Sequence, residues 1–86
     1  MEDLFSMPAV QQHNSYPVIV TPIPNGFILN PVDFEEMSLE ADNIQYGMSC
    51  IQNSIINKIS TSYPPEPTPT NEINMNLGEF LVIVNV

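Results

Sequence analysis

The chain has 86 residues and a formal net charge of −9, with ten acidic residues against a single basic one, Lys58. A chain of this length forms one domain at most, which buries only about 60% of the surface of the unfolded chain and leaves little room for a deep pocket. The charge repels phosphate backbones, so it argues against direct nucleic-acid binding and favours a basic partner. The alternative that the charge only maintains solubility stays open, because the acidic residues are spread along the sequence.

Cysteine content and hydropathy bear on the compartment. Cys50 is the only cysteine, which excludes an intrachain disulfide and fits a reducing cytosol, and its apolar neighbours predict a small buried side chain on a helix. No stretch approaches the roughly 18 apolar residues that span a bilayer, and the N-terminal MEDLF is acidic where a signal peptide is basic. We therefore expect a cytoplasmic protein without a membrane partner.

A flexible N-terminal extension and a hairpin are expected first. Residues 1–15 show no sustained hydrophobic period and end in the polar run QQHNS, which predicts the extension. Residues 16–21 alternate with the two-residue period of a strand, and Pro24-Asn25-Gly26 predicts a turn into a second strand.

A third strand and a helix follow. Residues 37–41 alternate apolar and polar side chains again, which predicts a strand. Asp42-Asn43 supplies a helix cap, and we expect the helix to span residues 44–59. Gly47 weakens it by about 0.5–1 kcal/mol, which is explained if the helix lies close against the sheet. The apolar stripe of the helix consists of Ile44, Met48, Ile51, Ile55 and Ile59.

A proline-rich segment ends the helix and leads into a last strand. Residues 64–69 hold four prolines, which exclude helix and predict a rigid extended spacer rather than a ligand for an SH3-type domain. Residues 78–86 are almost continuously apolar, which predicts a central strand covered by the helix on at least one face. The whole order predicts an α+β fold for residues 16–86, with a β-β-β-α-β sequence, a sheet of three to four strands and one helix packed on a face.

Several short sequence motifs in this order resemble those of the N-terminal domain of HicB-family antitoxins. The motifs are YPV at 16–18, GF at 26–27, PVDF at 31–34, the acidic cap before the helix, PPEPT at 64–68 and GEFLVIVNV at 78–86. No single motif is specific, and the likeness lies in their collinear spacing across residues 16–86.

The resemblance implies a partial RNase H-like fold and an antitoxin function. HicB-like antitoxins bind a small basic ribonuclease toxin, HicA, and block its cleavage of messenger RNA, and an acidic domain suits such a partner through electrostatic steering. Family members usually carry a DNA-binding segment after the last strand. No DNA-binding domain is visible in this sequence, so we expect no operator binding by residues 1–86.

The acidic turn after the second strand is the first candidate for partner contact. There Phe34 is either an exposed aromatic anchor ringed by charge or a core residue under the sheet, and both interpretations stay open. The full set of candidate partner-binding residues is Asp33, Phe34, Glu35, Glu36, Glu66 and Glu79. The apolar last strand also hints at a homodimer, because an exposed edge of so apolar a sheet tends to pair with another copy.

We expect neither catalysis nor metal binding by this chain. A metal-dependent nuclease would use Asp33, Glu36, Glu40 and Asp42 as magnesium ligands, but Glu36 and Glu40 are more simply the solvated face of a half-buried strand. His13 has no cysteine or aspartate at ligand spacing, and the sequence lacks a G-x-S-x-G motif and a phosphate-binding glycine loop. We therefore expect no catalytic residues, cofactor or metal. An orphan anti-defence binding module of mobile-element origin remains a third hypothesis.

Overall fold

The computed structural model describes residues 15–86, which form a four-stranded antiparallel sheet with one helix packed on it, confirming the predicted α+β class. The strands are β1 (Ser15–Ile23), β2 (Gly26–Pro31), β3 (Leu39–Ala41) and β4 (Phe80–Asn85), in the sheet order β3-β2-β1-β4. The predicted hairpin is confirmed, since β1 and β2 pair from Val18↔Pro31 to Ile23↔Gly26. Of the predicted N-terminal extension, residues 1–14 lie outside the described residues, and Ser15 begins β1.

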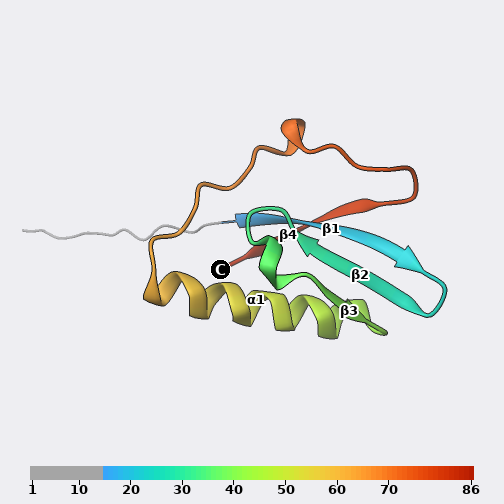
Figure 1. The fold of residues 1–86 in the computed structure, drawn as a ribbon, viewed down its shortest axis with the longest axis horizontal. Helices are drawn as coiled ribbons and strands as arrows, with labels where there is room; N and C mark the ends of the chain where they lie inside the picture. Colours follow the sequence, from blue (N-terminus) through green and yellow to red (C-terminus); the bar gives the residue numbers. More distant parts are fainter. Residues whose placement is uncertain (1–14) are drawn as a thin grey trace, which may run out of the picture.

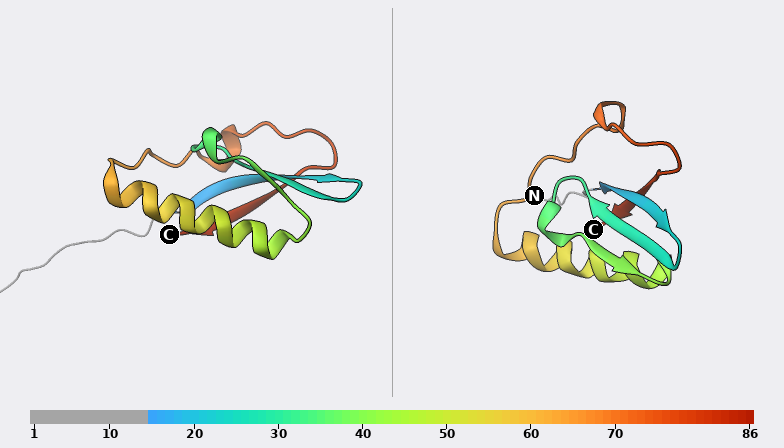
Figure 2. Two further views of the ribbon diagram at one scale, coloured as in Figure 1. Left: turned by 60° about the horizontal axis from the view of Figure 1, so that its bottom comes forward. Right: turned by 45° about the vertical axis from the view of Figure 1, so that its right-hand side comes forward.

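The helix α1 (Ile44–Thr61) follows the prediction closely. The side chain of Asn43 caps it by accepting a hydrogen bond from the backbone N–H of Tyr46 at 3.0 Å. Gly47 lies against the sheet as expected, because a Cβ there would stand 2.9 Å from Cδ1 of Leu29 and 3.0 Å from Cβ of Ala41. Figures 1 and 2 show α1 across one face of the sheet, while residues 62–79 return on the side of the sheet away from the helix.

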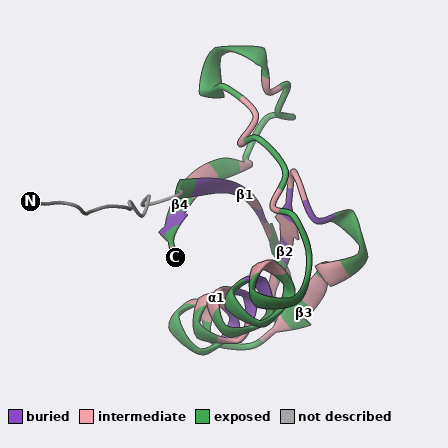
Figure 3. Cartoon of the chain, turned by 90° about the vertical axis from the view of Figure 1, so that its left-hand side faces the viewer, coloured by how far each residue is buried: buried purple, intermediate pink, exposed green. Residues whose placement is uncertain are grey.

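The core lies between α1 and the sheet. Alternate residues of each strand face the helix, as the two-residue period requires. The buried hydrophobic side chains are Tyr16, Val18, Val20, Leu29, Phe34, Ile51, Ile55 and Val84. Figure 3 shows these buried segments gathered where the curved sheet faces the helix.

The third strand is shorter than predicted. Residues 35–37 form a single 3-10 turn, η2 (Glu35–Met37), and only Leu39–Ala41 pair with β2. The pairing ends at Leu29↔Leu39. Two positions further along β2, Pro31 has no N–H to donate, so the ladder cannot extend to residue 37. The prediction that residues 37 and 38 belong to the strand is therefore wrong.

The position predicted for the last strand is also wrong. In the part of the chain that the structure describes, β4 pairs with β1 alone and lies at one edge of the sheet, while β3 lies at the other. Its continuous apolar sequence therefore does not reflect burial on both faces, because the side chain of Ile83 is 44% exposed. Among residues 15–86, no helix is both long and apolar enough to cross a membrane.

Candidate functional site: the acidic edge of the sheet

Phe34 is a core residue and not an exposed anchor. Its side chain is 2% exposed, and its ring meets that of Tyr16 edge to face, with the centroids 4.9 Å apart and the planes at 76°. The backbone turn that follows β2 points Phe34 inward and its neighbour Glu35 outward. The alternative in which Phe34 contacts a partner is thereby corrected, because a buried ring cannot reach one.

Asp33 is occupied by a contact within the fold. Its carboxylate accepts hydrogen bonds from the backbone N–H of Thr68 at 3.0 Å and from the hydroxyl of Thr68 at 2.5 Å. These bonds hold the proline-rich segment against the turn after β2. Asp33, which was predicted to bind a partner, therefore stabilises a contact within the fold instead.

The two candidates outside the acidic turn differ from each other. Glu79 accepts hydrogen bonds from the backbone N–H of Asn76 and the hydroxyl of Thr21, both at 2.8 Å, and these bonds lower its pKa. Glu66 is exposed beside Pro65, whose carbonyl oxygen accepts the hydroxyl of Tyr16 at 2.8 Å. Glu79 is thus hydrogen-bonded to its own loop and to β1, whereas Glu66 presents its carboxylate to solvent.

Burial and nearby negative charges both raise the pKa of Tyr16. Burial of its phenol is the main reason that its pKa is raised, and the negative charges of Asp33 and Glu66 add to the effect. Tyr16 therefore stays protonated and keeps donating to Pro65, which fixes the start of the proline-rich segment.

Free acidic side chains remain along η2 and β3. Half of the ten acidic residues lie within positions 33–42, and after Asp33 is set aside four of them form what we call the acidic edge: Glu35, Glu36, Glu40 and Asp42. All four are exposed. Glu36 makes a loose ion pair with Lys58 at 3.8 Å, and within residues 15–86 the other three make no side-chain hydrogen bond or ion pair. Unpaired charges of one sign on one edge attract an oppositely charged partner.

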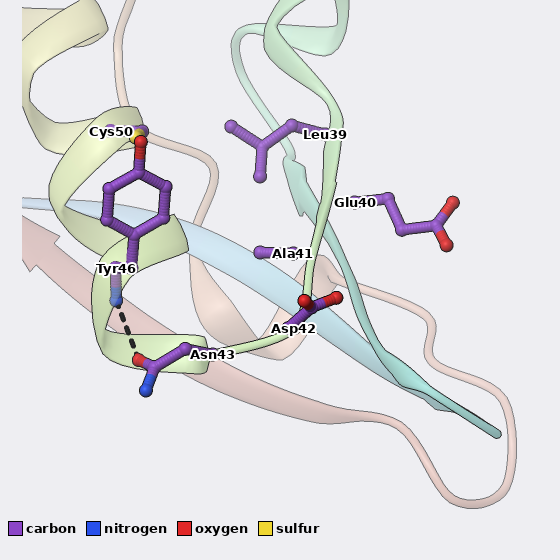
Figure 4. Close-up of a pocket in the computed structure, with 7 residues that line it drawn as sticks. All are labelled: Leu39, Glu40, Ala41, Asp42, Asn43, Tyr46 and Cys50. Carbon is purple, nitrogen blue, oxygen red and sulfur yellow. Dashed lines mark hydrogen bonds between the residues drawn. The ribbon is translucent and has the colours of Figure 1, made fainter.

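A hollow of about 490 Å³ lies beside this edge, between β3 and the start of α1. Figure 4 shows the side chains of Leu39 and Ala41 directed toward the helix and that of Glu40 directed away from it. Tyr46, which is 70% exposed, and Cys50 form the helical wall. Cys50 is only half-buried, so the prediction of a buried cysteine is wrong in degree. The hollow offers apolar surface next to Asp42, while the carboxylate of Glu40 points away from the helix.

The geometry offers little to a metal ion. Among the residues that the structure describes, no group of three or more histidine, cysteine, aspartate or glutamate side chains is placed to hold one. The four acids considered for magnesium include Asp33, which is turned toward Thr68, and Glu36, which faces Lys58. Residues Glu36 and Glu40 also do not share one strand face, because Glu36 belongs to η2.

The sequence did not single out Tyr46, and it grouped Glu40 and Asp42 with the acidic turn only as candidate magnesium ligands, not as a surface for a partner. The density of acids in residues 33–42 was a usable signal, but their joint position at a sheet edge requires the fold. No family model, curated protein or solved structure matches this chain.

Proposed function

We propose that this protein is a non-enzymatic, antitoxin-like inhibitor that binds a small basic ribonuclease of the HicA type and blocks its cleavage of RNA. The observation that carries the proposal is the acidic edge, in which Glu35, Glu40 and Asp42 are exposed and unpaired within the described residues, and Glu40 and Asp42 also belong to the lining of an apolar hollow. The order of strands and helix fits the HicB-like domain that the sequence resembles.

The chemistry of the acidic edge suits this partner. A ribonuclease must attract RNA phosphates, so its working surface carries lysine and arginine, and a carboxylate-lined edge competes for the same surface. The exposed ring of Tyr46 next to the hollow adds the kind of aromatic contact that contributes most to protein interfaces. Glu66 on the proline-rich segment is a second, weaker contact in this scheme.

The test is a binding and inhibition assay with the purified full chain. The partner to try is a small Lys/Arg-rich protein encoded beside it, with affinity measured by calorimetry and RNA cleavage followed on a gel. We expect a tight complex that weakens as salt rises, and cleavage that falls in proportion to the bound fraction. No complex with a basic ribonuclease, and undiminished cleavage, would contradict the proposal. A complex without inhibition would favour the orphan binding module instead.

A matched pair of variants locates the contact. Glu40 in β3 and Glu72 in the 3-10 turn η3 (Thr70–Glu72) are both exposed, and Lys at either position changes the net charge from −9 by two, to −7. Glu40→Lys should weaken the complex on the order of tenfold, which is about 1.4 kcal/mol. Glu72→Lys should change it far less. Equal effects would mean that only the net charge matters and not the acidic edge.

A further inference from the structure

The two edges of the sheet have opposite chemistry. The β3 edge carries Glu40 and Asp42, whereas β4, Phe80–Asn85, contains no charged residue at all. The inner strands β1 and β2 are uncharged as well, so β4 differs from β3 and not from the sheet as a whole: of the two edges, it is the one without charge. A basic partner finds no carboxylate along it.

Among residues 15–86, the β4 edge also shows few of the devices by which sheets avoid edge-to-edge pairing. Such edges are normally blocked by lysine, proline, a bulge or a covering segment. The sequence FLVIVN has none of the blocking residues, and β4 pairs with β1 in unbroken register from Ser15↔Asn85 to Val20↔Phe80. Within residues 15–86, no strand pairs with its other side.

Apolar side chains surround this edge on both faces. Phe80 on the helix-facing side is 40% exposed, and Ile83 on the opposite face is 44% exposed. On α1, Gln52 reaches β4 by donating to the carbonyl oxygen of Asn85 at 2.7 Å. Ile56, one helical turn further on, is 42% exposed on the same side of the helix. Apart from the carbonyl oxygen of Asn85, which Gln52 occupies, the edge therefore offers backbone groups flanked by apolar surface above and below.

We propose that β4 pairs antiparallel with β4 of a second copy of this chain, so that two four-stranded sheets join into one across a two-fold axis. A two-fold interface must be complementary to itself, and an uncharged strand meets this need because no like charges face each other along it. The acidic edge on β3 lies at the far side of each sheet, so pairing through β4 leaves it accessible. This inference does not depend on the antitoxin proposal.

Added salt should strengthen the pairing of two copies of this chain, whereas it should weaken the binding of a basic partner. Two copies with a net charge of −9 each repel one another, and added salt screens this repulsion while leaving backbone pairing and apolar contacts in place. We expect the mass of the full chain, measured by light scattering at several concentrations, to approach twice the 9.6 kDa of one chain as salt rises. A mass that stays at one chain at high salt and high concentration would overturn the proposal.

Two matched variants place the contact. Ile83 on β4 and Ile28 on β2 share the outer face of the sheet and are similarly exposed, at 44% and 37%. Ile83→Lys installs the residue that natural edges use against pairing and should give monomers, whereas Ile28→Lys should remain dimeric. Circular dichroism checks that both fold. Dimers in both variants, or monomers in both, would overturn pairing through β4. Slower amide exchange of residues 80–85 at higher protein concentration is expected as well.

Discussion

Asp33 and Thr68, which are 35 residues apart in the sequence, are joined by two hydrogen bonds to the same carboxylate. One comes from the backbone N–H of Thr68 and one from its hydroxyl, and together with the bond from Tyr16 to Pro65 they attach the proline-rich segment to the sheet. A segment of this composition does not hold its place through a hydrophobic core of its own. Its path over the domain depends on these polar contacts.

Removing the Asp33 carboxylate should loosen that segment. Asp33→Ala leaves the N–H of Thr68 without its partner, and we expect the free energy of unfolding to fall by about 1–3 kcal/mol. Urea unfolding measures this, and amide exchange at Thr68 should become faster. The matched control is Glu35→Ala, at an exposed position two residues on, with an expected change within about 0.5 kcal/mol. If both variants were equally stable, the Asp33 contacts would not stabilise the fold.

Replacing Phe34 tests whether it is a core residue or an exposed anchor for a partner. Truncation of a large buried ring costs about 3–5 kcal/mol, a large part of the stability of a small domain, so Phe34→Ala should be partly unfolded at room temperature. Tyr63→Ala removes a ring that is 97% exposed and should leave the thermal midpoint almost unchanged. A Phe34→Ala variant with full stability but weakened partner binding would restore the anchor interpretation.

Gly47 is a position where alanine should not help. On an open helix face, Gly→Ala gains about 1 kcal/mol, but here the new Cβ would press on Leu29, which is fully buried, and on Ala41. We expect a net loss on the order of 1 kcal/mol in denaturant unfolding. The loss should become smaller in an Ala41→Gly background, because that change removes the contact at 3.0 Å and leaves only the contact with Leu29. A gain in stability from Gly47→Ala alone would mean that the helix lies further from the sheet.

Glu79 predicts a pH dependence of known sign. Hydrogen bonds from Asn76 and Thr21 lower its pKa below the ordinary 4.5, so folding favours the charged form. Its stabilisation is complete above that ordinary pKa and is lost as the pH falls through the lowered value. The difference in the free energy of unfolding between the wild type and Glu79→Gln should therefore be constant near neutral pH and shrink below about pH 4.5. A difference that persists undiminished at lower pH would contradict this.

Local patterns were enough to predict the β1–β2 hairpin, the cap at Asn43, the approach of Gly47 to the sheet and the helix within two residues of its end. Each depends on the preferences of neighbouring residues: the alternation of a strand, a turn at Pro24-Asn25, an N-cap side chain and an apolar stripe. The net charge likewise follows from composition alone, and the expectation of a basic partner rests on it.

Which side chains are available to a partner was decided only by the tertiary structure. Phe34 is buried in the core, where its ring contacts that of Tyr16 edge to face, and the carboxylate of Asp33 is hydrogen-bonded to Thr68, which lies 35 residues further along the chain. The sheet order likewise placed β4 at an edge, although its apolar sequence is equally typical of a central strand. Sequence periodicity reports which residues share a face, whereas exposure depends on what packs against that face, and those contacts join residues that are distant in the sequence.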